Sequence, residues 1–289
     1  MHPADDDLPA SLGPVRSRRP LGGGDVGAAE EVRLADGRRV FVKRYAREGG
    51  EEMVASEAAG LRWLDEVDGA PPVPAVVAAE GRVLVLEMLD VTGGSSLDAA
   101  GEELLGRGLA ALHAAGAEAF GAVPPGASPA LGSRRLPVTP TSSWASFWGG
   151  QRVLPHARAA ADRGHLSRAD LAAVEEAVDR AEELMGPPEP PARCHGDLWW
   201  GNVVRTADGR PWLLDPSAHG GHREADLALL ELFGGLPARV VAAYEEVTPL
   251  ADGWRDRVGL HQLPPLLSHA VRFGGSYGPA AGAAARTAL

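Results

Sequence analysis

The sequence predicts an α+β protein with two lobes, a small β-rich N-terminal lobe and a larger, mostly helical C-terminal lobe. Three observations support this prediction. Strand-like runs separated by tight turns dominate residues 15–90, and helical periodicity dominates residues 91–289. A polar segment, CHGDLWWGN at residues 194–202, interrupts the helical part. With 289 residues, of which 45% are hydrophobic, the chain is long enough to bury a large core in two lobes.

The N-terminal lobe is predicted to contain four strands and one helix. A weakly alternating strand at Ala28–Leu34 is followed by the turn signal Asp36-Gly37 and a returning strand at Arg39–Tyr45. Apolar residues at helical spacing predict a helix at Glu51–Val67. Two further strands complete the lobe, Val73–Ala79 and Arg82–Leu89. The second of these is almost continuously apolar, which predicts a central position in the sheet.

The C-terminal lobe is predicted to be helical around a short β segment. A connection at Val91–Leu97 leads into it, and residues 122–141, rich in Pro, Gly and Ser, are expected to form an ordered surface loop. A strand at Ala192–Cys194 precedes the polar segment, and a hairpin that pairs Asn202–Val204 with Pro211–Leu214 follows it. The predicted helices are Glu102–Ala115, Ser143–Ala161, Arg168–Met185, Ala225–Phe233, Ala238–Val247 and Trp254–Phe273.

Composition and charge exclude several classes of protein. The chain has 28 basic and 39 acidic residues, and this net charge of −11 disfavours broad binding to nucleic acids or anionic membranes. Cys194 is the only cysteine, which excludes an intramolecular disulfide and a multi-cysteine zinc site. No apolar run approaches the ~20 residues of a membrane span, and the acidic start lacks the apolar core of a signal peptide. A cytoplasmic location is therefore expected, while no pattern indicates an oligomeric state.

The polar segment and the hairpin after it carry residues typical of phosphoryl transfer. Asp197 and Asn202 stand five positions apart, which is the separation of Asp and Asn in the H-R-D-x-x-x-x-N loop of protein kinases. Asp215 closes an apolar run, where those enzymes place the metal-binding Asp of their D-F-G motif. We therefore predict a protein-kinase-like fold in which Asp197 is the catalytic base and Asn202 and Asp215 bind Mg²⁺. His195 is predicted to brace the loop through hydrogen bonds.

The N-terminal lobe carries a predicted site for the phosphates of ATP. The segment GGGDVG at Gly22–Gly27 matches G-x-G-x-x-G, and the hairpin after it favours a kinase-type loop over a dinucleotide site or an inert turn. Lys43, in VFVKRY, resembles the kinase lysine that contacts the α- and β-phosphates, and Glu57 is its predicted partner. The full set of predicted nucleotide-binding residues is Gly22, Gly23, Gly24, Gly27, Lys43, Glu57, Glu87 and Leu89.

These assignments give the predicted division of the chain. Residues 1–14 are expected to be disordered because Pro, Asp and Gly dominate them, and the Ala-rich end from Pro279 is expected to fray. Residues 15–90 are the predicted nucleotide-binding lobe. Residues 91–289 are the predicted catalytic and acceptor-binding lobe.

Several motifs resemble the fructosamine kinase (ketosamine 3-kinase) family, which is itself similar to aminoglycoside phosphotransferases and protein kinases. They are CHGDLWWGN, LLDPS, GHREADLALLELFGG, GWRDRVGLHQL and RFGGSYG, and the resemblance extends from the Gly22 loop to Tyr277. It implies ATP-dependent phosphorylation of the sugar 3-hydroxyl of fructosamine or ribulosamine adducts. The 3-phosphates of such adducts decompose spontaneously, so the resemblance implies deglycation of a small-molecule or protein-bound glycated amine.

The chain departs from the family after Asp215. Relatives read DPAxYYGHRE where this chain reads DPSAHGGHRE, so His219 and Gly220 replace two aromatic residues, and His261 also replaces a usual Tyr. Fewer bulky side chains predict a wider acceptor site with a looser preference for the amine. The predicted acceptor residues are Trp199, His219, His222 and Arg223.

Two other functions are compatible with these motifs. One is phosphorylation of an aminoglycoside or another amino sugar or alcohol by the same fold. The other belongs to a different class, a nucleotide-binding pseudokinase that regulates a partner. A chain without catalysis would have no chemical need for the complete set of five polar residues, which argues against the pseudokinase: Lys43, Glu57, Asp197, Asn202 and Asp215.

Overall fold

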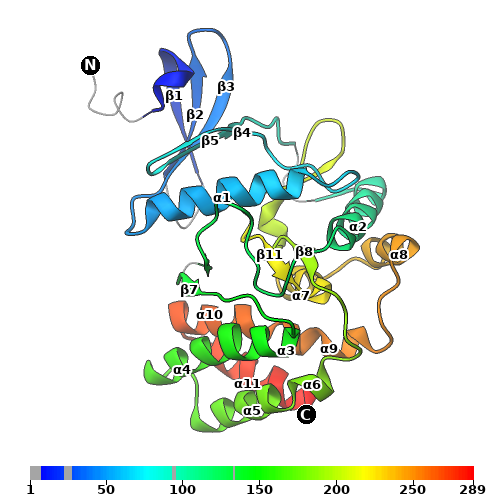
Figure 1. Ribbon diagram of the computed structural model, residues 1–289. Helices are drawn as coiled ribbons and strands as arrows, with labels where there is room; N and C mark the ends of the chain where they lie inside the picture. The colour runs from blue at the N-terminus through cyan, green and yellow to red at the C-terminus, as the bar shows by residue number, and fades with distance from the viewer. Residues whose placement is uncertain (1–7, 23–27, 93–95, 133) are drawn as a thin grey trace.

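The computed structural model describes residues 8–22, 28–92, 96–132 and 134–289, and it has the predicted two-lobe, protein-kinase-like architecture (Figure 1). The N-terminal lobe is a five-stranded antiparallel sheet in the order β1-β2-β3-β5-β4, with helix α1 packed against it. The elements of this lobe are β1 Val15–Leu21, β2 Ala28–Leu34, β3 Arg39–Arg44, α1 Gly50–Asp65, β4 Val76–Glu80 and β5 Val83–Glu87.

Strand β3 lies between β2 and β5, and its two faces have different neighbours. Side chains alternate along a strand, so Val40 and Val42 point to one face, where they join a small apolar cluster of the outer sheet. Phe41 and Lys43 point to the other face, toward the layer that contains α1. The period of the strand therefore directs Lys43 toward the helix that carries Glu57.

The structure differs from the sequence prediction at the N-terminal edge. Strand β1 was not predicted, because VRSRRPL contains three arginines and Pro20. An edge strand accepts such residues, and Arg18 and Arg19 form ion pairs with Glu30 and Glu31 of β2. Of the segment predicted to be disordered, residues 1–7 lie outside the described residues. Residues 10–12 form a short 3₁₀ helix in which Leu12 is buried, so the prediction of disorder is wrong there.

The C-terminal lobe is built from helices around three short strand pairs. Helix α2 begins at Asp98, whose side chain caps the helix by accepting the Gly101 N–H at 2.9 Å. The helices are α2 Ala99–Ala114, α3 Trp144–Ser146, α4 Leu154–Asp162, α5 Arg168–Asp179, α6 Ala181–Leu184, α7 Arg223–Leu232, α8 Ala238–Val247, α9 Trp254–His261, α10 Leu263–Phe273 and α11 Tyr277–Ala288. The strands are β6 Ala130–Leu131, β7 Leu136–Pro137, β8 Ala192–Cys194, β9 Val203–Arg205, β10 Pro211–Leu213 and β11 His219–Gly221. Among the described residues, none of these helices combines the length and apolar character needed to cross a bilayer.

Four predictions about the helical part need correction, two of them beside proline. The predicted helix 168–185 is divided into α5 and α6 at Arg180. The predicted helix 143–161 contains a π-helical stretch at Phe147–Val153 (η2), since Pro155 cannot donate a backbone hydrogen bond one turn back. The predicted helix 254–273 is divided into α9 and α10 at Gln262, just before Pro264-Pro265. The C-terminal end does not fray, because it forms helix α11. The small residues Ala281 and Ala285 of this helix are fully buried in the lobe.

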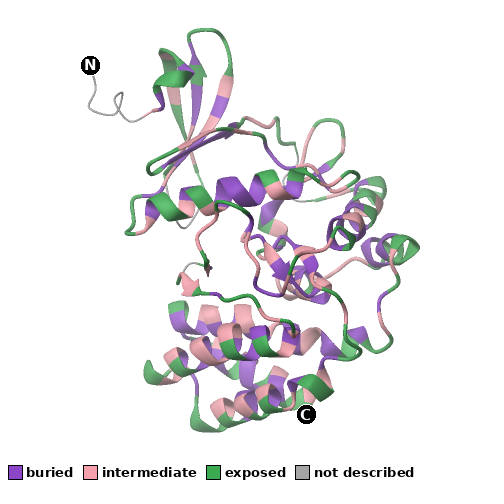
Figure 2. Cartoon of the chain, in the orientation of Figure 1, coloured by how far each residue is buried: buried purple, intermediate pink, exposed green. Residues whose placement is uncertain are grey.

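The buried apolar residues of the described ranges form three clusters, and their division does not follow the division into lobes. The first cluster joins Val54, Leu61 and Leu64 of α1 to Leu105 and Leu109 of α2 and to residues of β10, α7 and α8. The second fills the space among the C-terminal helices, and the third lies on the outer face of the sheet. Figure 2 shows the buried residues of α1 and of the region where β8, β11 and α7 meet. Helix α1 is thus packed into the C-terminal lobe as well as onto its own sheet.

Candidate active site

The segment after β8 brings Asp197 and Asn202 together. A tight turn, η3 at Trp200–Asn202, folds the chain back, and the Asn202 side-chain N–H₂ group donates to the Asp197 carbonyl at 2.8 Å. The same nitrogen lies 3.3 Å from the Asp197 carboxylate. With its nitrogen occupied in this way, Asn202 has its side-chain oxygen left to offer a cation.

Asp215 follows β10, which pairs with β9 directly after Asn202. The Leu214 N–H donates to the Asn202 carbonyl at 2.9 Å. The hairpin therefore brings Asp215 next to Asn202, the other predicted metal ligand, although the two residues are separated in the sequence. Asp215 has a left-handed backbone, with φ of 52°. This conformation costs a non-glycine residue roughly 1–2 kcal/mol and is retained where the surroundings impose it.

Lys43 connects the two lobes at this site. Its Nζ lies 3.0 Å from Glu57 Oε2 and 3.0 Å from Asp215 Oδ1. Burial opposes the charge of Lys43, but the two carboxylates outweigh it and raise the pKa of the lysine. Burial opposes the charge of Glu57 as well and raises the pKa of its carboxyl group. Glu57 and Asp215 both form ion pairs with Lys43. The predicted Lys43–Glu57 pair is therefore present, and Asp215 is held with it.

Tyr45 is a site residue that the sequence analysis missed. Its hydroxyl donates to Glu57, and its ring centre lies 5.1 Å from the Nζ of Lys43. Tyr45 is buried beside the pair, two residues beyond Lys43 on the same face. The alternation of strand β3 was a signal that could have found it.

The surroundings of Asp197 change the pKa of its carboxyl group. The side chain reaches solvent. Surrounding protein atoms nevertheless displace water from it, and together with the negative charge of Asp215 they raise the pKa of Asp197 to about 6. Next to Asp197, the side chains of Asn202 and Asp215 supply oxygen atoms, which are the ligands that Mg²⁺ prefers. The residues present fit a magnesium ion bound with nucleotide phosphates.

Asp226, which the sequence analysis did not include among the site residues, holds the start of the segment 194–202 through its carboxylate. Its carboxylate accepts the His195 N–H at 2.7 Å and the Gly196 N–H at 2.9 Å, and the Nε2 atom of His113 lies 3.3 Å away. Burial opposes ionisation of Asp226, but these hydrogen bonds outweigh it and lower its pKa. A carboxylate between apolar residues of a predicted helix was the signal for a buried role. As predicted, His195 itself braces the loop, with Nε2 2.9 Å from the Leu214 carbonyl.

We expect Asp226→Asn to lower the free energy of unfolding by about 2–4 kcal/mol, because one backbone N–H of the loop would then face an N–H₂ group. Chemical denaturation measures this change. Asp256→Asn is the matched control, since Asp256 also lies in the first turn of a helix but is exposed. The control should stay within about 0.5 kcal/mol of the unaltered protein. Equal stability of both variants would contradict the bracing role.

The adjacent tryptophans Trp199 and Trp200 have different surroundings. Trp200 packs against the first apolar cluster, and its indole N–H donates to the Gly235 carbonyl at 2.8 Å. Trp199 is 41% exposed and meets Phe233 edge-on, with ring centres 6.4 Å apart. Trp199 is therefore the member of the pair that can contact an acceptor.

The expectation of a wider acceptor site after Asp215 is wrong at Gly220. A Cβ atom on this residue would lie 2.1 Å from the Ala119 carbonyl, so the neighbouring segment occupies the space of a side chain. The Gly121 N–H donates to the Gly220 carbonyl at 2.7 Å, which fixes this close approach. His219 packs against Phe147, with ring centres 5.7 Å apart, and burial lowers its pKa to about 4. The missing aromatic side chain is replaced by backbone from another segment.

His222 and Arg223 have partners of their own. His222 caps α7 by accepting the Glu224 N–H at 3.2 Å, and its ring stacks on His261 at 4.9 Å. Arg223 forms two hydrogen bonds of 2.6 Å with Glu189. Within the described residues, neither side chain is brought into contact with Asp197, Asn202 or Asp215. Their acceptor role stays a prediction.

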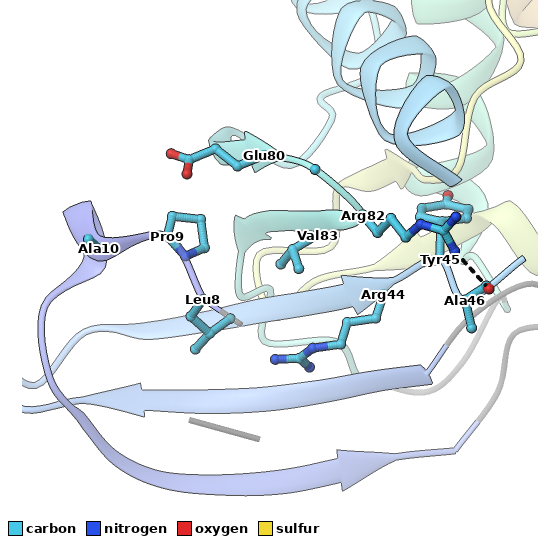
Figure 3. A pocket seen from close by; sticks show the side chains of 10 residues that line it. Leu8, Pro9, Ala10, Arg44, Tyr45, Ala46, Glu80, Arg82 and Val83 are labelled. Carbon is cyan, nitrogen blue, oxygen red and sulfur yellow. Dashed lines mark hydrogen bonds between the residues drawn. The ribbon is translucent and has the colours of Figure 1, made fainter. Parts of the chain in front are cut away.

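Of the remaining predicted nucleotide-binding residues, Gly22 directly follows β1 and is exposed. Gly23, Gly24 and Gly27 lie outside the described residues. Glu87 and Leu89 line a cavity of about 300 Å³ together with the turn between β9 and β10. A larger cavity of about 610 Å³ lies between Leu8–Ala10 and strands β3 and β5 (Figure 3). It contains none of the predicted site residues, although Tyr45 lines it.

The fold and the site together define a small-molecule phosphotransferase of the protein-kinase-like class. The structure of choline kinase LicA from Streptococcus pneumoniae is similar in fold, with a TM-score of 0.63 and 15% sequence identity over 96% of this chain and 95% of that chain. Ion pairs link Lys43 with Glu57 and Asp215, and a hydrogen bond links Asn202 with Asp197, while the roles of these residues in phosphoryl transfer stay a prediction.

Within this class, the chain belongs to the fructosamine kinase family, whose model matches residues 10–289. It is 44% identical to the "putative fructosamine-3-kinase" from Thermobifida fusca, whose crystal structure gives a TM-score of 0.87 over 97% of this chain and 96% of that chain. It is also 33% identical to a "Probable ketoamine kinase" from Synechocystis sp., over 91% of this chain and 87% of the relative. These relatives agree with the family resemblance of the motifs.

Proposed function

We propose that the protein transfers the γ-phosphoryl group of Mg²⁺-bound ATP to the 3-hydroxyl of ketosamines, the fructosamine or ribulosamine adducts of amines. The supporting observations are the ion pairs of Lys43 with Glu57 and Asp215 and the hydrogen bond from Asn202 to Asp197, in a chain of this family. Small adducts and adducts on protein lysines share the sugar that is phosphorylated, so both are proposed acceptors.

The proposed roles follow from the position of each side chain. Asp197 accepts the proton of the acceptor hydroxyl as the oxygen attacks phosphorus, which its solvent-reaching carboxylate permits. Lys43 contacts the nucleotide phosphates, and Glu57 and Tyr45 fix the direction of its ammonium group. Asn202 and Asp215 would hold Mg²⁺, which neutralises phosphate charge when it is bound.

A row of aromatic rings that begins at Trp199, two residues after Asp197, is the proposed wall of the acceptor site. It starts with Trp199 and Phe233 and continues to His269, whose ring centre lies 5.2 Å from that of Phe233. Phe273 and Tyr277 extend the row, at 5.5 Å and 5.0 Å from His269. Flat apolar faces of this kind suit stacking against a sugar ring or the carbon chain of an amine.

We expect ketosamines to be phosphorylated with a kcat/KM at least about tenfold above that of any aminoglycoside, which corresponds to about 1.4 kcal/mol of transition-state binding. ATP consumption measured against ribulosamines, fructosamines and aminoglycosides would test this. Asp197→Asn is the control for consumption that does not depend on the site. A preference for aminoglycosides would overturn the acceptor assignment. ATP binding without phosphorylation of any acceptor would instead favour the pseudokinase.

A further inference from the structure

Arg135 has an uncommon backbone conformation. Among the described residues, only two non-glycine residues have a left-handed backbone, Arg135 with φ of 50° and Asp215 with φ of 52°. Each costs roughly 1–2 kcal/mol, and such residues are found where surrounding contacts hold them for a purpose. Asp215 belongs to the proposed metal site. Arg135 lies elsewhere in the sequence, in the loop between α2 and α3 of the C-terminal lobe.

The side chain of Arg135 contacts the start of α1 in the other lobe. Its Nη1 atom donates to the Gly49 carbonyl at 3.3 Å, and its guanidinium forms an ion pair with Glu52. Nη2 also donates to the Ser128 hydroxyl at 3.3 Å. A cation at a helix N-terminus is opposed by the helix dipole, so helix stability alone does not explain this position.

A second contact reaches α1 beside Glu57. The Ser128 N–H donates to the Ser56 hydroxyl at 3.0 Å, and Ser56 directly precedes Glu57. One turn further on, a Cβ atom on Gly60 would lie only 3.3 Å from Pro216, which follows Asp215. Figure 1 shows the segment that carries β7 between α1 and the C-terminal helices. Contacts from the C-terminal lobe therefore reach α1 before, beside and after Glu57.

We propose that Arg135 and Ser128 are positioning residues for the nucleotide phosphates. They fix the rotation and depth of α1 and so set the place of Glu57, which in turn orients Lys43. Because Lys43 also contacts Asp215, a displaced α1 would alter the phosphate contact and the proposed metal ligand together. This inference rests on the proposed function, since it concerns how ATP is held.

Arg135→Ala tests the inference, with Arg134→Ala as the matched control. Arg134 is the neighbouring exposed arginine, and its side chain donates to the Pro155 carbonyl at 3.4 Å rather than to α1. We expect Arg135→Ala to raise the KM for ATP and the dissociation constant of a fluorescent ATP analogue about three- to tenfold, with the acceptor KM unchanged. Arg134→Ala should stay within about twofold. Ser56→Ala should shift both constants in the same direction by a smaller factor, because it removes the second contact.

Combination with Glu57→Gln separates positioning from general stability. If Arg135 acts through Glu57, Arg135→Ala should weaken nucleotide binding much less in the Glu57→Gln background than in the unaltered protein. Full additivity, or a lower unfolding temperature with unchanged nucleotide constants, would overturn the inference. Failure of the unaltered protein to bind the ATP analogue would overturn the proposed function itself, and the inference with it.

Discussion

Asp197→Asn is expected to lower turnover by about 10²–10⁴, equivalent to roughly 3–5 kcal/mol of activation free energy. Asparagine keeps the size of the side chain but cannot accept the proton of the acceptor hydroxyl. ATP affinity should stay largely intact, since Lys43 and Glu57 hold the phosphates. Single-turnover measurements with the best ketosamine, combined with nucleotide titration, separate the chemical step from binding.

Asp256→Asn is the matched control for this variant. Asp256 lies in the first turn of α9, where it is exposed. Removal of its charge should change turnover by less than about twofold, as is usual for a surface position. Near-normal turnover of Asp197→Asn would remove this residue from the role of base.

Asp215→Asn is expected to lower kcat/KM for ATP by at least about 10²-fold and to raise the concentration of Mg²⁺ needed for half-maximal activity. The variant removes one negative charge that would hold the metal, while asparagine tolerates the left-handed backbone at this position. A titration of activity against Mg²⁺ at saturating acceptor measures both effects.

The same Asp256→Asn variant serves as the control in this titration, because it removes one exposed carboxylate without touching Lys43. It should have the Mg²⁺ dependence of the unaltered protein. A normal Mg²⁺ requirement in Asp215→Asn would show that the metal is held elsewhere. Loss of Lys43 orientation alone would raise the KM for ATP without this shift.

The sequence predicted the elements whose periodicity and turn chemistry are strong. The Asp36-Gly37 hairpin and the helix that contains Glu57 are present, because local spacing alone determines them. Strand β1 was missed because its pairing with β2, rather than any pattern of its own, makes it a strand. The frayed end was wrong for a similar reason, since Ala281 becomes ordered only by packing against other helices.

The candidate catalytic and metal-binding residues could be found from the sequence more completely than the residues that position them. The spacing of Asp197, Asn202 and Asp215 matches that of a kinase-type loop, so the motif points to them directly, and their roles stay a prediction. Asp226 and Arg135 act across long separations in sequence, and only the folded chain shows which groups they contact. Gly220 was misjudged because the segment that fills its side-chain space comes from about a hundred residues earlier in the chain.

The apolar cluster shared by α1 and the C-terminal lobe limits how relatives of this protein could exchange parts by recombination. A chimera joined near residue 90 would place Val54, Leu61 and Leu64 of one parent in a core otherwise built from the other parent. Close-packed interiors tolerate such mismatches poorly, at about 1–3 kcal/mol for each overpacked position. A chimera that folds would have to take α1 and its packing partners in α2, β10, α7 and α8 from the same parent. Only the outer face of the sheet could then come from the other parent.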